Sequence, residues 1–162
     1  MVDQATTQQP SQPAPSSTAP TPKPSQAPSG GGQANATILI ADDDITLRDM
    51  YQTRLETEGF KVLVSADGEE TLANLREQKP DLVLLDIMMP KMNGLDVLEQ
   101  MKKDPELKKI PVIILTALIQ DLTKVKSLMT GADDYLMKSE VMPGEVIQKV
   151  KQVLEKSRGK SN

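Results

Sequence analysis

The stretch that decides the fold is LVLLDIMMPKMNG, residues 82–94. Four apolar residues lead into one carboxylate, Asp86, and then Pro90 and the Asn93-Gly94 pair turn the chain. A short apolar run bounded by turn residues predicts a strand that is buried on both faces. An acid at the end of such a strand lies where open parallel sheets form their sites, although a lone Asp there is more often a cap or a turn residue.

Composition excludes several function classes. The chain has 162 residues, a formal net charge of -4, no cysteine and no histidine. The acidic balance argues against nucleic acid or an anionic membrane as the main partner. Without Cys and His there is no disulfide, thiolate zinc site or histidine chemistry, so any metal would be an oxygen-bound ion such as Mg²⁺, Mn²⁺ or Ca²⁺. The sequence shows neither an apolar run of roughly 20 residues nor a secretory signal, so we expect a cytoplasmic protein.

Residues 1–36 differ from the rest of the chain. They contain most of its prolines, no Leu, Ile, Phe or Tyr, and charged side chains only at Asp3 and Lys23. Such a segment buries too little apolar surface to offset the entropy of ordering it. We expect a disordered spacer that ends in a joint of three glycines, residues 30–32. A ligand for a proline-binding module is the weaker alternative, because no PxxP with a flanking Arg is present.

The remaining chain alternates short apolar runs with helical patterns. Strands are predicted at 38–40, 60–65, 82–85, 110–115 and 135–137, and helices begin near residues 45, 68, 94, 121 and 143. This alternation predicts a parallel sheet with helices on both faces and right-handed crossovers. We expect one domain over residues 37–156, a frayed tail over 157–162, and no C-terminal effector or DNA-binding domain.

Polar side chains follow four of the predicted strands. Asp42 and Asp43 come after the first strand, Asp86 after the third, Thr116 after the fourth and Lys138 after the fifth. In a parallel sheet these strand ends share one edge, so the side chains should meet in one crevice. Each alone has a structural explanation, but together they favour a functional site.

The chemistry of these groups fits phosphoryl transfer. Clustered carboxylates repel unless a cation neutralises them, and Mg²⁺ is the natural cation for oxygen ligands. A carboxylate facing the crevice could then attack a phosphoryl donor. The transferred group spreads its charge over three oxygens, and the ammonium of Lys138 and the hydroxyl of Thr116 could bind them. Asp44 is expected to cap the following helix instead.

Four segments resemble the receiver (CheY-like) domain of two-component response regulators. They are ILIADDD (38–44), LVLLDIMMPKMNG (82–94), IPVIILTA (110–117) and GADDYLMKS (131–139). The resemblance covers residues 38 to about 156. It implies a flavodoxin-like (βα)5 three-layer α/β sandwich with strand order 2-1-3-4-5. It also implies a stand-alone, phosphorylation-dependent signalling switch of a phosphorelay, which catalyses only its own phosphotransfer and slow autodephosphorylation.

The resemblance assigns roles to individual residues. Asp86 would be the phosphoacceptor, Thr116 the switch hydroxyl, Lys138 the phosphate-pairing lysine and Tyr135 the switch aromatic. The implied Mg²⁺ ligands are Asp43, Asp86, the backbone carbonyl of Met88, and Asp42 directly or through water. The implied partners are a sensor histidine kinase or histidine phosphotransfer protein as donor and a downstream protein target, with the chain a monomer or a phosphorylation-linked homodimer.

Two features depart from the family pattern. The family usually has a cis proline after the lysine, where this chain has Ser139, so the reach of Lys138 is open to question. Secondly, the positions two residues after Asp86 and Thr116 hold Met88 and Leu118. Polar groups there help to place the hydrolytic water in fast-cycling relatives, so two apolar side chains predict slow autodephosphorylation.

Two alternatives stay open. A pseudo-receiver would use the fold for docking only, although the complete set of acidic, hydroxyl and lysine groups argues against it. A Mg²⁺-dependent phosphatase of the haloacid dehalogenase type would need a second acid two residues after its nucleophile, where this chain has Met88. A partner could bind the exposed side of the fourth helix, at Thr123, Lys124, Lys126 and Ser127, though an ordinary solvated face is at least as good an interpretation.

Overall fold

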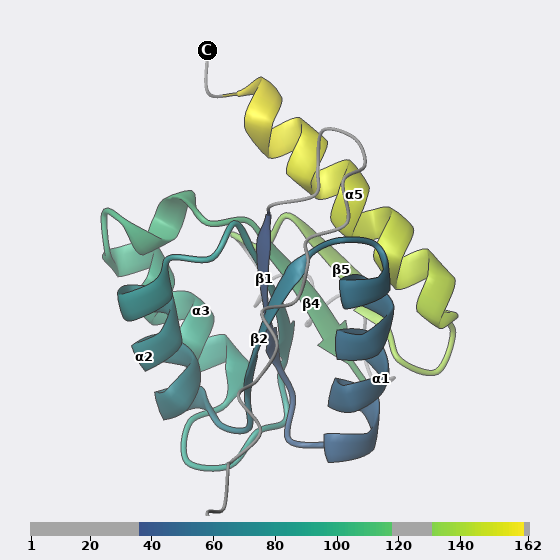
Figure 1. The fold of residues 1–162 in the computed structure, drawn as a ribbon. Helices are drawn as coiled ribbons and strands as arrows, with labels where there is room; N and C mark the ends of the chain where they lie inside the picture. The colour runs from purple at the N-terminus through teal and green to yellow at the C-terminus, as the bar shows by residue number, and fades with distance from the viewer. Residues whose placement is uncertain (1–35, 118–130, 161–162) are drawn as a thin grey trace, which may run out of the picture.

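The computed structural model describes residues 36–117 and 131–160, which form a five-stranded parallel sheet with helices on both faces (Figure 1). The strand order is β2-β1-β3-β4-β5, as the resemblance to receiver domains implies. The strands are β1 (Thr37–Ala41), β2 (Lys61–Ser65), β3 (Leu82–Asp86), β4 (Val112–Thr116) and β5 (Asp134–Met137). The predicted α/β fold is therefore confirmed.

Within the described residues, two α-helices lie on each face of the sheet. They are α1 (Ile45–Thr57), α2 (Gly68–Gln78), α3 (Gly94–Lys103) and α5 (Pro143–Gly159), together with the short 3-10 helix η1 (Leu107–Lys109). Figure 1 shows α2 and α3 on one side of the sheet and α1 and α5 on the other. The predicted helix at residues 121–130 lies outside the described residues. Within the described part of the chain, no helix is long and apolar enough to cross a membrane.

Strand β3 lies at the centre of the sheet, and all five of its residues are buried. Because side chains alternate between the faces of a strand, β3 contributes to both layers of the core. Leu82 and Leu84 pack on the α1/α5 side, while Val83 and Leu85 pack on the α2/α3 side. The prediction of a strand buried on both faces is confirmed, and its last residue, Asp86, is fixed by packing on either side.

Aspartate side chains cap the first two helices. The carboxylate of Asp44 accepts the backbone N–H groups of Thr46 and Leu47 at 3.0 and 3.2 Å, which confirms its predicted role as the cap of α1. Asp67 caps α2 in the same way, accepting the N–H of Glu70 at 2.9 Å. These bonds satisfy N–H groups that have no partner within the helix.

Two element boundaries differ from the sequence expectation by more than one residue. Strand β4 begins at Val112 rather than at residue 110, because η1 ends at Lys109 and the backbone of Pro111 has no N–H to donate to a neighbouring strand. Helix α5 continues to Gly159, past the domain boundary predicted at residue 156. Its predicted apolar face is buried, at Val146, Ile147, Val150, Val153 and Leu154.

Candidate functional site

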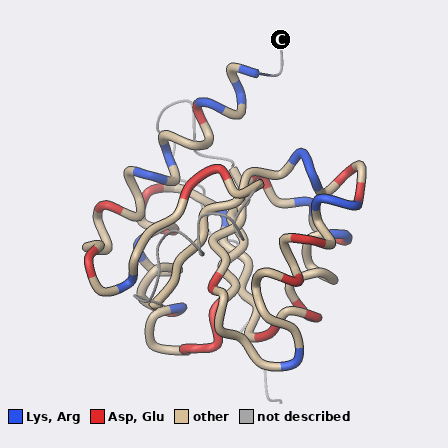
Figure 2. Tube along the Cα trace, turned by 180° about the vertical axis from the view of Figure 1, so that it is seen from behind, with Lys and Arg blue, Asp and Glu red and all other residues tan. Residues whose placement is uncertain are grey.

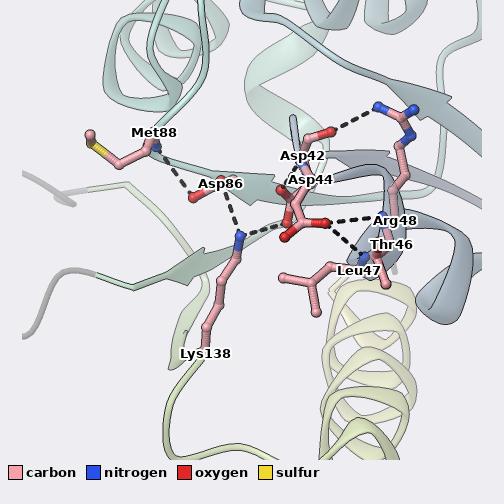
Figure 3. A network of polar contacts seen from close by, with 8 residues as sticks. All are labelled: Asp42, Asp44, Thr46, Leu47, Arg48, Asp86, Met88 and Lys138. Atoms are coloured by element: carbon pink, nitrogen blue, oxygen red, sulfur yellow. Dashed lines mark hydrogen bonds and ion pairs between the residues drawn. The ribbon is translucent and has the colours of Figure 1, made fainter.

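Three charged side chains meet at the C-terminal edge of the sheet. The register pairs Ala41 of β1 with Leu85 of β3, so the next residues, Asp42 and Asp86, leave the sheet side by side. The ammonium of Lys138, just after β5, lies 3.1 Å from Oδ2 of Asp86 and 2.6 Å from Oδ2 of Asp42. Figure 3 shows Lys138 reaching between the two carboxylates. Segments more than forty residues apart in sequence are thus joined, as the parallel topology predicts.

The two carboxylates are almost fully enclosed. Asp42 is 1% exposed and Asp86 is 3% exposed, whereas Asp43 is exposed at the mouth of the site. Oδ1 of Asp42 accepts the N–H of Asp44 at 3.0 Å. Its Oδ2 lies 2.6 Å from the Lys138 ammonium, which is its ion-pair partner.

The carboxylates of Asp42, Asp43 and Asp86 fit a divalent cation. Each can offer one oxygen, and the three oxygens lie within 4.8 Å of one another. An all-oxygen, carboxylate-rich donor set suits Mg²⁺, which commonly keeps several waters beside one or two carboxylates. Asp44 is committed to the N-terminus of α1 and stays outside this set. The acidic cluster that the sequence predicts is therefore assembled, and its donor set fits Mg²⁺.

The environment raises the pKa of Asp86 from 3.8 to about 6. Burial is the main cause, the Lys138 charge opposes it, and the Asp42 charge adds to it. For Lys138, burial alone would lower the pKa, but the adjoining carboxylates of Asp42 and Asp86 raise it above the ordinary value. The lysine therefore stays protonated and is the main cation of the site in the absence of metal.

The remaining predicted residues surround this centre. Thr116 is buried at the end of β4, and its backbone carbonyl accepts the N–H of Lys138 at 2.8 Å. The N–H of Met88 donates to Oδ1 of Asp86 at 3.2 Å, while the Met88 side chain is 59% exposed and points away from Asp86 in Figure 3. Tyr135 is half-buried on β5, against the α2/α3 side of the core. Leu118 lies outside the described residues.

Ser139 does not prevent Lys138 from reaching the site. Within the described residues no peptide bond is cis, so the Lys138–Ser139 bond is trans. Its ammonium nevertheless contacts both buried carboxylates. The family's cis proline is thus not needed here to bring the lysine to Asp86.

Two supporting residues were not predicted from the sequence. Nη1 of Arg48, on α1, donates to the backbone carbonyl of Asp42 at 3.0 Å and fixes the loop that carries the acids. Gly94, at the start of α3, approaches the backbone of Asp86 so closely that an added β-carbon would overlap its carbonyl group. The contact of Arg48 could have been suggested by the position of a basic residue in the second turn of a helix that follows three acids. The close approach of Gly94 could not, because it depends on how α3 packs against β3.

Comparisons with known proteins agree with this geometry. The response regulator receiver domain family matches residues 38–151. The alkaline phosphatase synthesis transcriptional regulatory protein PhoP of Bacillus subtilis is 38% identical over 123 residues, which are 76% of this chain and 50% of that protein. The DNA-binding response regulator MtrA of Mycobacterium tuberculosis is 42% identical over 114 residues, 70% of this chain and 48% of that protein. The chain therefore spans about half the length of these curated relatives.

Solved structures show the same fold. A CheY-like response regulator receiver domain protein from Methanospirillum hungatei is 33% identical, with a TM-score of 0.70, over 78% of this chain and 98% of that one. The receiver domain of the Francisella response regulator 1452 is 32% identical, with a TM-score of 0.69, over 76% of this chain and 99% of that one. On sequence, fold and the acidic site at the end of β3, the chain belongs to the response regulator receiver domain family.

Proposed function

We propose that the chain is a phosphorylation-controlled signalling switch in which Asp86 accepts a phosphoryl group. The donor would be a phosphohistidine on a sensor histidine kinase or a histidine phosphotransfer protein. An oxygen of Asp86 would form a bond to phosphorus as the phosphorus–nitrogen bond breaks, and the imidazole would leave. The observation that carries this proposal is the buried Asp86 carboxylate beside two further acids and the Lys138 ammonium.

The residues around Asp86 suit the charge of a phosphoryl group. Asp42, Asp43, Asp86 and the carbonyl of Met88 would hold Mg²⁺, which would offset the negative charge of the phosphoryl oxygens. Lys138 would exchange its contact with Asp86 for a phosphoryl oxygen, for which its present distance of 3.1 Å leaves only a small movement. The hydroxyl of Thr116 would bind another oxygen.

The signal would leave through the surface next to β5. Movement of Thr116 toward the phosphoryl group would make room for Tyr135 to turn inward, which would change the face formed by β5, α5 and the predicted fourth helix. Such a coupling is typically worth about 1–3 kcal/mol. A downstream protein would bind the altered face, with the chain a monomer or a phosphorylation-linked homodimer. The domain from residue 37 to the end of α5 at Gly159 would be this cytoplasmic switch, and residues 1–36 would be a spacer.

We also propose that the phosphoryl group is long-lived. The side chain at residue 88 is apolar and extends away from Asp86, so its effect would come from lacking a polar group that could orient water, and not from covering the carboxylate. Leu118 would act in the same sense. Hydrolysis without an oriented water depends on random approach from solvent and is correspondingly slow.

A phosphorylation assay tests the function. The protein would be incubated with Mg²⁺ and acetyl phosphate and analysed by intact mass spectrometry. We expect the mass of one phosphoryl group to be added to the wild type and to Asp49→Asn, an exposed control on α1, but not to Asp86→Asn. Continuous turnover of the donor would indicate a phosphatase, and neither labelling nor turnover would indicate a pseudo-receiver; either result would contradict the proposal.

A further inference from the structure

A basic cavity lies at the opposite end of the sheet from Asp86, beside the start of β4. Its volume is about 540 Å³. Five lysines from three separate segments line it: Lys102 of α3, Lys108 and Lys109 of η1, Lys156 of α5, and Lys160 just after α5. Cations therefore surround one concavity instead of following a single helix face. Figure 2 shows basic positions both around the α3–η1 connection and on the last part of α5.

The positive charge of this cavity is poorly balanced. Asp133 is its one acidic lining residue, and the Asp133 carboxylate already accepts the N–H of Val112 at 2.9 Å. Among the described residues, Lys109 has a single weak ion pair, at 4.0 Å from Glu106, and the other four lining lysines have none. The whole chain carries a net charge of -4, so the cavity is a local exception to an acidic protein.

The negative charge of the helix ends beside the cavity offsets only part of the positive charge of its lysines. The C-terminal ends of α3 and α5, and of the short η1, lie beside the cavity. A helix C-terminus carries about half a negative charge, which one lysine more than neutralises. Five lysines against at most three such ends and one aspartate leave a clear positive excess. An excess of one sign inside a concave surface attracts a ligand of the opposite sign.

The kinds of lining side chain narrow the ligand class. Lysine binds phosphoryl oxygens as a point charge, whereas arginine binds planar carboxylates and phosphates by paired hydrogen bonds. The lining contains five lysines and no arginine, so the cavity offers five separate point charges, each able to bind a phosphoryl oxygen. It also contains no aromatic ring on which a nucleic acid base could stack. The volume falls within the roughly 300–1,000 Å³ of small-molecule sites.

We propose that this cavity binds an oligophosphate, that is, a short chain of linked phosphoryl groups. Several lysines could contact successive phosphoryl groups at once, which one phosphate ion would not allow. The chain could come from inorganic oligophosphate or from the phosphates of a nucleoside triphosphate, and the apolar floor at Ile110, Pro111 and Val153 offers no group that would recognise a base. The inference does not depend on phosphorylation of Asp86, because the two sites lie at opposite edges of the sheet.

The test is a titration of the full chain at low salt with EDTA, followed by calorimetry and by backbone amide NMR. The ligands are tripolyphosphate, orthophosphate, ATP and adenosine. The cavity variant is Lys108→Gln with Lys156→Gln. The control is Lys61→Gln with Lys103→Gln, which removes the same charge at exposed positions outside the cavity lining. All four positions are exposed, so both variants should keep the wild-type unfolding midpoint.

We expect tripolyphosphate to bind the wild type at least about tenfold more tightly than orthophosphate. The cavity variant should weaken this binding by roughly tenfold, and the control by less than about twofold. Amide shifts should centre on Ile110, Val112 and Val153. ATP should match tripolyphosphate within about threefold, since only its phosphates are bound, and adenosine should cause no shift.

Three results would overturn the proposal. Equal weakening by the cavity and control variants would mean diffuse attraction to the whole surface. Far tighter binding of ATP than of tripolyphosphate would mean that a base is recognised. Tighter binding of an RNA oligonucleotide or of polyglutamate at the same lysines would mean that the cavity is part of a macromolecular interface.

Discussion

Gly94 lies directly against the backbone of Asp86: a β-carbon at Gly94 would come within 2.9 Å of the Asp86 carbonyl carbon and closer still to its oxygen. Both neighbours are backbone atoms, so neither could turn aside as a flexible side chain could. The start of α3 can therefore approach the end of β3 this closely only because Gly94 has no side chain. Any residue larger than glycine should push the helix away from the strand that carries Asp86.

Gly94→Ala should therefore destabilise the protein. A helical Gly→Ala change normally stabilises by about 0.5–1 kcal/mol, but overpacking here should reverse the sign and cost about 1–3 kcal/mol. Gly144→Ala is the matched control, because Gly144 also lies in the first turn of a helix and has no atom within 4 Å of its ideal β-carbon. Urea unfolding of both variants gives the comparison. A stabilised Gly94→Ala protein would show that the close approach relaxes without cost.

Asp86→Asn should stabilise the metal-free protein, and more so at neutral pH. The pKa of Asp86 is raised to about 6, chiefly by burial, so between pH 4 and 6 the folded state binds more protons than the unfolded state. The contribution of the Asp86 carboxyl to the free energy of unfolding is therefore present at low pH and is lost as the pH rises through 6. The advantage of the variant should grow across this window to about 1–3 kcal/mol.

Unfolding of both proteins in EDTA from pH 4.5 to 7.5 measures this difference. Asp67→Asn is a control of opposite sign, because hydrogen bonds from the α2 backbone, above all the Glu70 N–H, and from Lys91 lower the pKa of Asp67. Asp67→Asn should be less stable than the wild type at neutral pH, and this difference should shrink as the pH falls. A pH-independent difference for Asp86→Asn would contradict the expectation.

Lys138→Met should destabilise the metal-free protein strongly. The change leaves the buried carboxylates of Asp42 and Asp86 without their cation, and breaking a buried pair in this way costs on the order of 3–5 kcal/mol. Lys149→Met is the control, because Lys149 pairs with Asp134 at 2.9 Å in a partly exposed position, where the loss should be about 1 kcal/mol or less.

Added Mg²⁺ should restore more stability to Lys138→Met than to the wild type, since the ion would replace the missing positive charge. Thermal unfolding with Mg²⁺ and with EDTA measures this restoration. The same gain in both proteins would mean that the ion does not neutralise the charge that Lys138 neutralises.

Met88→Asn combined with Leu118→Glu should shorten the lifetime of the phosphorylated protein. Polar groups at both positions could orient a water toward the phosphoryl group, and general base assistance of this kind contributes up to about 10²–10⁴-fold. Loss of phosphoryl mass with time, after removal of the donor, gives the rate. Met88→Leu with Leu118→Met is the apolar control and should keep the wild-type rate. A short phosphoryl lifetime in the wild type would contradict the proposal from the start.

Much of the site could be predicted because parallel strands end at one edge of a sheet. That rule brings Asp86, Asp42 and Lys138 together from sequence order alone. It does not say which atoms will touch. The contact of Lys138 with both carboxylates, and that of Arg48 with the carbonyl of Asp42, depend on how side chains cross between elements.

The basic cavity was harder to foresee for the same reason. Its lysines come from the neighbouring ends of α3 and η1 and from the end of α5, which lies much later in the chain, and η1 itself was not predicted. Each lysine taken alone resembles an ordinary solvated charge at a helix end. Packing of these three ends around the start of β4 is what gathers them.

The double contact of Lys138 has one more consequence, for the order of events in this protein. Because Lys138 pairs with both Asp42 and Asp86, the chain itself supplies a positive charge to the acidic edge, which can therefore be folded without an ion from solution. Metal would then enter a pocket that is already shaped, and the phosphoryl group would come last. Under the proposed function, a cell that runs short of magnesium would keep this protein intact but unable to receive its signal.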